Sequence, residues 1–322
     1  ALGCSTVNGY ETNLSSFGAF VGRCANRISN GAFTINGKEY QLMKNDHGNN
    51  LHGGEPFYNK LMYEAECLEG EDEVGVEFSR LSPDGEQGFP GNLDITVTYT
   101  LTDDNEILIE YLAVSDQDTV VNFTNHSYFN LAGHNAGTIF DHEVMICADA
   151  FTPTDEFLVP TGEIRSVEGT PFDFRSAKAI GRDINEKNDD LLKATNVFNG
   201  YDHCFNFSNV TRESVKRGAV FHPSDRNAGL LLSFAALRGL PYLRMVKKLV
   251  SATERADDTH VRVKHSVSVI DSRRLVFFYS GNLIVSYKSL KAGGELVSLR
   301  HSVLIGHKLI LVSALENVSS VS

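Results

Sequence analysis

Residues 93–114, LDITVTYTLTDDNEILIEYLAV, restrict the fold more than any other part of the chain. Apolar residues alternate with polar ones on both sides of a polar stretch, at Ile95, Val97, Tyr99, Leu101, Ile107, Ile109 and Tyr111. Because successive side chains of a strand point to opposite faces of its sheet, this period of two is typical of strands with one buried face. The intervening Asp103-Asp104-Asn105 supplies turn residues, so the segment predicts a β-hairpin.

Asn-Gly dipeptides predict further tight turns near the N-terminus. Asn30-Gly31 and Asn36-Gly37 flank the short run Ala32–Ile35, and Asn-Gly favours hairpin turns because both central residues need a positive φ. Clusters of Pro, Gly and Asp at 82–92 and 151–163 predict loops between more strands. Many short strands joined by such turns favour a sandwich or a barrel. We therefore expect an all-β fold, a large antiparallel β-sandwich.

The chain of 322 residues is long enough for one large all-β domain or two ordinary ones. No fixed-period repeat and no linker composition divides it, so we expect a single domain over 1–322. The pattern nevertheless changes after about residue 211, because residues 1–211 carry a net charge of −21 and residues 212–322 a net charge of +9. In the second part, 230–237 predicts a helix and 260–270 predicts a strand.

Composition and charge exclude several classes of protein. The net charge of −12 argues against a nucleic-acid partner, and no run approaches the eighteen or so apolar residues of a membrane helix. Five scattered cysteines without metal-ligand spacing predict free thiols in a reducing compartment. Since no signal-peptide pattern is visible, we expect a cytoplasmic protein without a membrane partner, either a monomer or a weak homodimer.

The segment Asn122–His134, NFTNHSYFNLAGH, raises the question of chemistry. Interpreted as a strand, it places five polar or amphipathic side chains on one face, namely Asn122, Thr124, His126, Tyr128 and Asn130. A buried histidine satisfied by its neighbours is the usual explanation of a lone His. A face with this many polar groups, however, either meets water or lines a site.

Two other segments contain candidate residues. His52 precedes two glycines in NNLHGG (49–54), where glycine permits either a close approach to a ligand or a simple turn. Arg23 and Arg27 stand four apart in GRCANRI (22–28), for which solvated surface arginines are the default explanation. The chain has no phosphate-binding loop, CxxC, HExxH or GxSxG, so nothing in it predicts a metal ion or a cofactor.

Taken in order, several segments together resemble the aldose 1-epimerase (galactose mutarotase) family. They are FGAFVGRCANRISNGAFTINGKEYQL, NNLHGG, FSRLSPDGEQGFPGNLDITVTYTL, NFTNHSYFNLAGH, DHEVMICADAFTPTDEFLVPTGEIRSVEGTPFDFR and NGYDHCFNF. The resemblance is strong over residues 1–210, including the spacing between segments, and weak over 211–322.

The resemblance implies a galactose mutarotase-like supersandwich with an open sugar cleft, and cofactor-free, metal-free interconversion of the α and β anomers of free hexoses such as galactose and glucose. His126 would be the general acid that protonates the ring oxygen, and His52 would assist it. The family's motifs place Asn26, Arg27 and Asp202 as sugar-binding residues and Tyr128 in the cleft wall. The residue types suit the reaction, because ring opening needs an acid and a base beside the sugar, and histidine has an ordinary pKa of about 6.5.

The C-terminal third departs from the family. The family's base is a glutamate in a late strand that follows a QFYTGN-like segment; VFFYSGN (276–282) echoes that segment, with Phe277 where a glutamine is expected. His307 or its neighbours stand where the glutamate should be, and Glu316 is a poor match, so the sequence does not assign the base. The chain also begins where family members already have strands. We interpret 211–322 as an altered segment, such as a shifted reading frame or a splice product; a divergent tail with a basic surface is the alternative.

Two alternatives to an active mutarotase stay open. One is a catalytically weak or inactive sugar-binding protein on the same scaffold, which needs the binding residues but no base. The other is a sugar-phosphate epimerase, which needs cationic side chains around the phosphate. The acidic character of residues 1–211 argues against the latter.

Overall fold

The structure is a computed structural model of the chain. It describes residues 1–12, 15–193 and 200–207, and beyond them the backbone of eight strands: β17 (Lys216–His222), β18 (Gly229–Leu237), β19 (Tyr242–Val250), β20 (His265–Ser268), β21 (Leu275–Tyr279), β22 (Leu283–Ala292), β23 (Glu295–Ile305) and β24 (Lys308–Val312).

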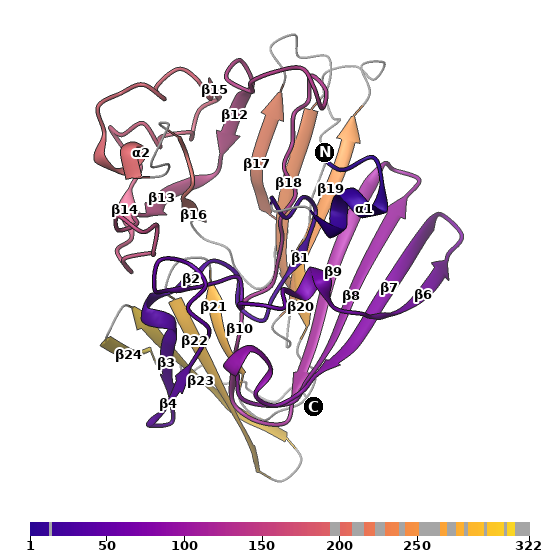
Figure 1. The fold of residues 1–322 in the computed structure, drawn as a ribbon, viewed down its shortest axis with the longest axis vertical. Coiled ribbons are helices and arrows are strands. Elements are labelled where there is room, and N and C mark those ends of the chain that lie inside the picture. Colours follow the sequence, from indigo (N-terminus) through magenta and orange to yellow (C-terminus); the bar gives the residue numbers. More distant parts are fainter. Residues whose placement is uncertain are drawn as a thin grey trace, which may run out of the picture.

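A ten-stranded sheet is the largest element (Figure 1). Its other strands are β6 (Glu64–Glu69), β7 (Glu73–Ser82), β8 (Leu93–Thr102), β9 (Glu106–Ser115), β12 (Glu143–Ile146) and β15 (Lys178–Ala179). The order is β15-β12-β17-β18-β19-β9-β8-β7-β6, with β20 also paired to β9. Strands β8 and β9 pair antiparallel with Leu101 opposite Ile107, which confirms the hairpin predicted from the alternation.

Smaller sheets carry the rest of the described chain. Their strands are β1 (Phe20–Val21), β2 (Arg27–Ile28), β3 (Ala32–Ile35), β4 (Lys38–Gln41), β5 (Asn50–Leu51), β10 (Thr119–Val121), β11 (Thr124–Asn125), β13 (Ala148–Thr152), β14 (Arg165–Ser166) and β16 (Cys204–Phe207). Strand β10 joins the five-stranded sheet β10-β21-β22-β23-β24, β14-β13-β16 form another, and β1-β11, β2-β5 and β3-β4 form pairs. The described helices are short: α1 (Val7–Glu11), α2 (Asp189–Lys193), η1 (Ser29–Gly31), η2 (Tyr58–Lys60) and η3 (Glu86–Gly88). The prediction of an all-β protein is confirmed.

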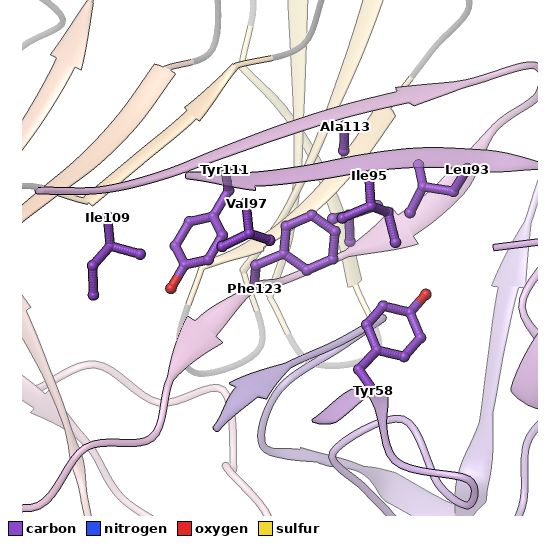
Figure 2. Close-up of a cluster of buried hydrophobic side chains, with 9 residues drawn as sticks. Tyr58, Leu93, Ile95, Val97, Ile109, Tyr111, Ala113 and Phe123 are labelled. Atoms are coloured by element: carbon purple, nitrogen blue, oxygen red, sulfur yellow. The ribbon is translucent and has the colours of Figure 1, made fainter. Parts of the chain in front are cut away.

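A hydrophobic core lies on one face of the β8–β9 hairpin (Figure 2). Alternate residues of the two strands enter it, together with side chains from the neighbouring segments, and its buried members are Tyr58, Leu93, Ile95, Val97, Ile109, Tyr111, Ala113, Val121 and Phe123. Each fully buried large apolar side chain contributes about 1.5–3 kcal/mol relative to exposure. Because Val121 and Phe123 belong to this core, it fixes the chain immediately before His126.

Four local predictions are corrected. Asn122–His134 is not one strand, because β10 ends at Val121, β11 covers only Thr124–Asn125, and the backbone is irregular from His126 onward. Asn130 is buried and caps the following turn, with its side-chain oxygen accepting from Ala132 N at 3.1 Å. The polar row therefore does not lie on one strand face.

Two further corrections concern a helix and a turn. The helix expected at 230–237 is instead β18, a strand paired on both sides, because a short apolar run fits a buried strand as well as a helix. Asn36-Gly37 closes the β3–β4 hairpin as predicted, with φ of 52° and 77°. Asn30-Gly31 does not close a hairpin, because it lies in η1 and β2 pairs with β5.

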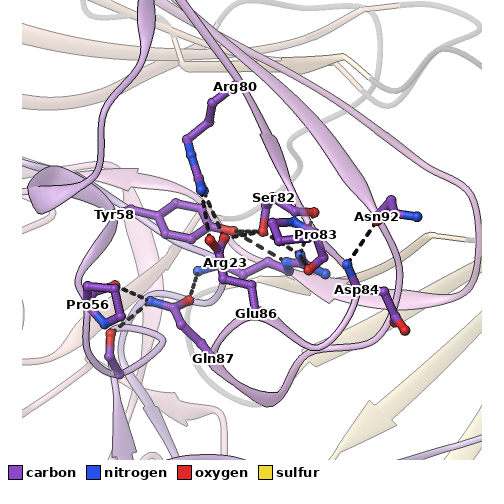
Figure 3. A network of polar contacts seen from close by, with 11 residues as sticks. Arg23, Pro56, Tyr58, Arg80, Ser82, Pro83, Asp84, Glu86, Gln87 and Asn92 are labelled. Atoms are coloured by element: carbon purple, nitrogen blue, oxygen red, sulfur yellow. Dashed lines mark hydrogen bonds and ion pairs between the residues drawn. The ribbon is translucent and has the colours of Figure 1, made fainter.

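Arg23 is fully buried, which contradicts its interpretation as a surface arginine (Figure 3). Its guanidinium donates to the carbonyl oxygens of Pro90 at 2.8 Å and Gly91 at 2.9 Å, and to the hydroxyl of Ser82. Ser82 in turn contacts Glu86, which binds Arg80 through two hydrogen bonds of 2.8 Å. These bonds make Arg23 a structural link between its own segment and residues 82–91.

Candidate active site

The segments that contain Asn26 and His52 lie antiparallel and bind each other. Arg27 is opposite Leu51 in the β2–β5 pair, so the residues next to them also face each other. The amide of His52 donates to the Asn26 carbonyl at 3.0 Å, and the amide of Asn26 donates to Nδ1 of His52 at 3.1 Å. The pairing of β2 with β5 thus brings together Asn26 and His52, which are 26 positions apart in the sequence.

A close backbone approach explains the first glycine after His52. Gly53 has a φ of 85°, and a Cβ there would lie 2.4 Å from the Gly22 carbonyl oxygen. Gln87 also stabilises this loop, because its side-chain amide donates to the carbonyls of Gly54 at 2.8 Å and Pro56 at 2.9 Å (Figure 3). The NNLHGG loop is therefore seated directly on the segment that carries the arginines.

His126 enters the site from the irregular continuation of β11. Its backbone extends the β1–β11 pairing, with the amide of His126 donating to Ala19 O at 2.8 Å and the amide of Gly18 donating to His126 O at 3.1 Å. The His126 ring lies 5.3 Å from the His52 ring, centre to centre, and 5.0 Å from the Tyr128 ring. Two histidines and a tyrosine thus meet although no regular strand face aligns them.

Hydrogen bonding fixes the tautomer of His52. Because Nδ1 accepts a hydrogen bond from the Asn26 amide, the neutral ring carries its own proton on Nε2. Burial, and to a smaller extent the charges of His126 and Arg27, lower the pKa of His52 to about 4, against a small opposing effect of Asp46. His52 is therefore a neutral donor near neutral pH.

The stability of the protein is expected to fall as the pH is lowered from about 6.5 to about 4. Over this range the unfolded chain protonates His52, whose ordinary pKa is 6.5, whereas the folded chain does not until about pH 4. Acid therefore favours the unfolded state, by about 2–3 kcal/mol at the lower end. Urea denaturation across this range measures the effect, and His52→Gln, which keeps an acceptor for the Asn26 amide, is expected to flatten it. Equal pH slopes in the two proteins would contradict the assignment.

Asp202 is the last of the six residues that the resemblance selects. It is exposed and precedes β16, which pairs with β13. Burial and, secondarily, the charge of Asp202 raise the pKa of Tyr128. Hydrogen bonds and ring contacts thus join Asn26, Arg27, His52, His126 and Tyr128, whereas Asp202 is linked to Tyr128 through the effect of its charge.

Sequence reasoning missed two side chains of this cluster. Asn26 donates to the sulfur of Cys204 at 3.6 Å, and Arg27 Nε donates to Asp46 Oδ2 at 2.6 Å. Cys204 directly follows GYDH, and Asp46 precedes NNLHGG, so position next to a motif was the available signal. None of the five cysteines, which all lie in the described part of the chain, forms a disulfide.

The general base is not identified. His307 and Glu316 lie outside the described residues. Phe277 lies in β21, of which the structure describes the backbone only. Among the described residues, Asp46 and Asp202 are the carboxylates that act electrostatically on His52 and Tyr128, and Asp46 is engaged with Arg27.

The described part of the chain contains no group of three His, Cys, Asp or Glu residues that could hold a metal ion. None of its helices has the length and apolarity to cross a membrane.

Known proteins resemble this chain in sequence and in fold. The model of a family described as aldose 1-epimerase matches residues 1–234. Bovine galactose mutarotase is 49% identical over 204 residues, which are 63% of this chain and 56% of that protein. Aldose 1-epimerase of Escherichia coli is 42% identical over the same shares of the two chains. The chain thus aligns with about half the length of these relatives.

Solved structures support the same relationship. Galactose 1-epimerase from Lactobacillus acidophilus superposes with a TM-score of 0.64 at 28% identity, covering 76% of this chain and 67% of that one. An aldose epimerase homologue from C. elegans gives a TM-score of 0.63 at 25% identity, covering 96% and 84%. The predicted galactose mutarotase-like β-sandwich is confirmed.

Proposed function

Because the chain belongs to the aldose 1-epimerase family, we propose that it interconverts the α and β anomers of free hexoses such as galactose and glucose. The contact between His126 and His52, with ring centres 5.3 Å apart beside Arg27 and Tyr128, carries this proposal. The relatives named for this activity are longer than the part that aligns with this chain. The activity is therefore proposed for this chain and tested directly.

The proposed reaction is an acid–base ring opening. His126 gives a proton to the ring oxygen while a base accepts the proton of the anomeric hydroxyl, and the bond between C1 and the ring oxygen breaks. Rotation about the C1–C2 bond of the aldehyde presents its other face, and the reverse transfers close the ring as the other anomer. His52 supports the acid as a neutral Nε2–H donor to a sugar oxygen.

The other residues of the cluster suit a ligand made of hydroxyl groups. Arg27 and Asp202 provide charge-assisted hydrogen bonds, Asn26 provides an amide, and Tyr128 provides a half-exposed aromatic wall. Holding the sugar in one orientation contributes to the rate because the acid must reach one particular oxygen.

Polarimetry of freshly dissolved α-galactose tests the proposal. The chain is expected to speed the approach to anomeric equilibrium above the buffer rate. Absence of any acceleration, at protein concentrations where calorimetry detects galactose binding, would refute the catalytic proposal.

That last outcome would favour the second candidate function, a sugar-binding protein without catalysis. It is supported by one observation: in the described part of the chain, the carboxylate that acts on His52 is tied to Arg27 and is unsuited to be the base. A single domain over 1–322, a monomer or weak homodimer, a cytoplasmic location and the lack of nucleic-acid or membrane partners stay predictions.

A further inference from the structure

We propose that Asp46 is a positioning residue of the sugar site, which orients the Arg27 guanidinium toward the substrate. This inference rests on the proposed function and extends it to a residue outside the motifs that resemble the family. Arg27 Nε donates to Asp46 Oδ2 at 2.6 Å, and each of the two side chains is only 16% exposed. A charge-assisted hydrogen bond this short, largely withdrawn from water, holds the planar guanidinium in one orientation.

The contact with Asp46 engages Arg27 at its Nε atom. Within the described residues, neither Nη1 nor Nη2 of Arg27 makes a hydrogen bond, although its Nε and its backbone amide both do. An arginine held at Nε presents its terminal amino groups as a fork of donors. Two neighbouring hydroxyls of a sugar are suitable acceptors for such a fork.

The backbone around Asp46 is itself fixed. Asp46 and Asn49 exchange amide-to-carbonyl hydrogen bonds of 3.1 and 2.8 Å, and the two residues between them, His47 and Gly48, have φ of 48° and 83°. These positive values are typical of a tight two-residue turn. The carboxylate is thus presented from a closed turn rather than from a free loop.

This turn is attached to the strand that pairs with Arg27. The Asn45 side chain accepts from the Leu51 amide at 2.8 Å and donates to the Leu51 carbonyl at 3.0 Å, and Leu51 is opposite Arg27. The turn, β5 and β2 therefore form one unit that sets the distance between Asp46 and Arg27. The same unit leads directly into His52.

The charges around Asp46 keep it ionised. Burial by itself raises the pKa of Asp46, but the hydrogen bond and charge of Arg27, aided by His47, outweigh it and the pKa lies below its ordinary value. His47 Nδ1 lies 3.1 Å from Asp46 Oδ1, and the His47 ring stacks on Phe157 at 5.9 Å. An ionised Asp46 also offsets the positive charge of Arg27 near His52.

Asp46→Ala is expected to raise the dissociation constant for D-galactose about tenfold, because Arg27 then loses its fixed orientation. Asp46→Asn, which keeps an acceptor, should fall between this variant and the unmodified chain. In turnover, KM should rise by more than kcat falls. Calorimetry and polarimetry provide these values.

The matched control is Glu163→Gln. Glu163 accepts from Arg165 Nε at 2.8 Å, so the same type of contact is altered outside the cluster, and galactose binding should not change. In an Arg27→Ala background, Asp46→Ala should have no further effect on binding. A tenfold loss that persists in that background, or unchanged binding in Asp46→Ala alone, would overturn the inference.

A measurement without sugar separates this inference from the proposed function. The Arg27 Nε–H proton should exchange slowly with solvent in the unmodified chain and rapidly in Asp46→Ala, as measured by proton–nitrogen NMR. Rapid exchange in the unmodified chain would overturn the inference. Slow exchange together with a lack of galactose binding would contradict the proposed function. Asp46 would then hold Arg27 in place without any role toward a sugar, so the inference would also be overturned.

Discussion

Replacement of His126 by alanine should lower kcat for galactose mutarotation about 10²–10⁴-fold, the usual contribution of a positioned general acid. The variant loses the proton donor for the ring oxygen, and the neighbouring His52 cannot replace it. His52 has a pKa of about 4 and uses Nδ1 to accept from Asn26, so it holds its single proton on Nε2 as a hydrogen-bond donor. KM should change less, because Arg27, Asn26 and Asp202 are intact.

His134→Ala is the control for this measurement. His134 is exposed and lies eight residues further along the same segment, so its loss should leave the rate unchanged. Initial rates from polarimetry over a series of α-galactose concentrations separate kcat from KM. If His126→Ala keeps most of the rate while remaining folded, another group supplies the proton and His126 is not the acid.

Arg23→Ala should lower the free energy of unfolding by about 3–5 kcal/mol. The change removes a fully buried side chain and leaves the carbonyls of Pro90 and Gly91 and the hydroxyl of Ser82 without this donor. It also separates residues 22–28 from 82–91, so galactose binding should weaken together with stability.

Arg175→Ala is the matched surface substitution. Arg175 is exposed and paired with Asp173 at 2.7 Å, and exposed ion pairs contribute little to stability because water and salt screen them. Urea denaturation at neutral pH compares the two variants. Similar losses of stability would mean that the Arg23 contacts contribute no more than a surface ion pair.

The parts of the fold predicted from the sequence are those encoded locally. The β8–β9 hairpin follows from alternation and a polar turn, and the β3–β4 hairpin follows from Asn36-Gly37. Motifs predict the residues of the candidate site; the β2–β5 and β1–β11 pairs position Asn26, Arg27, His52 and His126, and Asp202 precedes β16, which pairs with β13. Their roles toward a sugar stay predictions.

The remaining features depend on contacts between distant segments. Burial of Arg23 needs acceptors from residues 82–91, which no window around GRCANRI contains. The division of residues 119–125 into two strands arises because β10 and β11 have different partners, β21 and β1. The apolar run at 230–237 is a strand because neighbours flank it on both edges. None of these partners is visible in the local pattern.

The two partners of residues 119–125 also have a consequence for the order of folding. Strand β11 pairs with Phe20–Val21, which leave the ribosome long before it, whereas Thr119 of β10 pairs with Leu275. Pairings over such a separation close a long loop and form slowly. During synthesis, the segment that ends in His126 can therefore pair first through β11, whose partner β1 has already been made. Its β10 end must wait until most of the chain has been made.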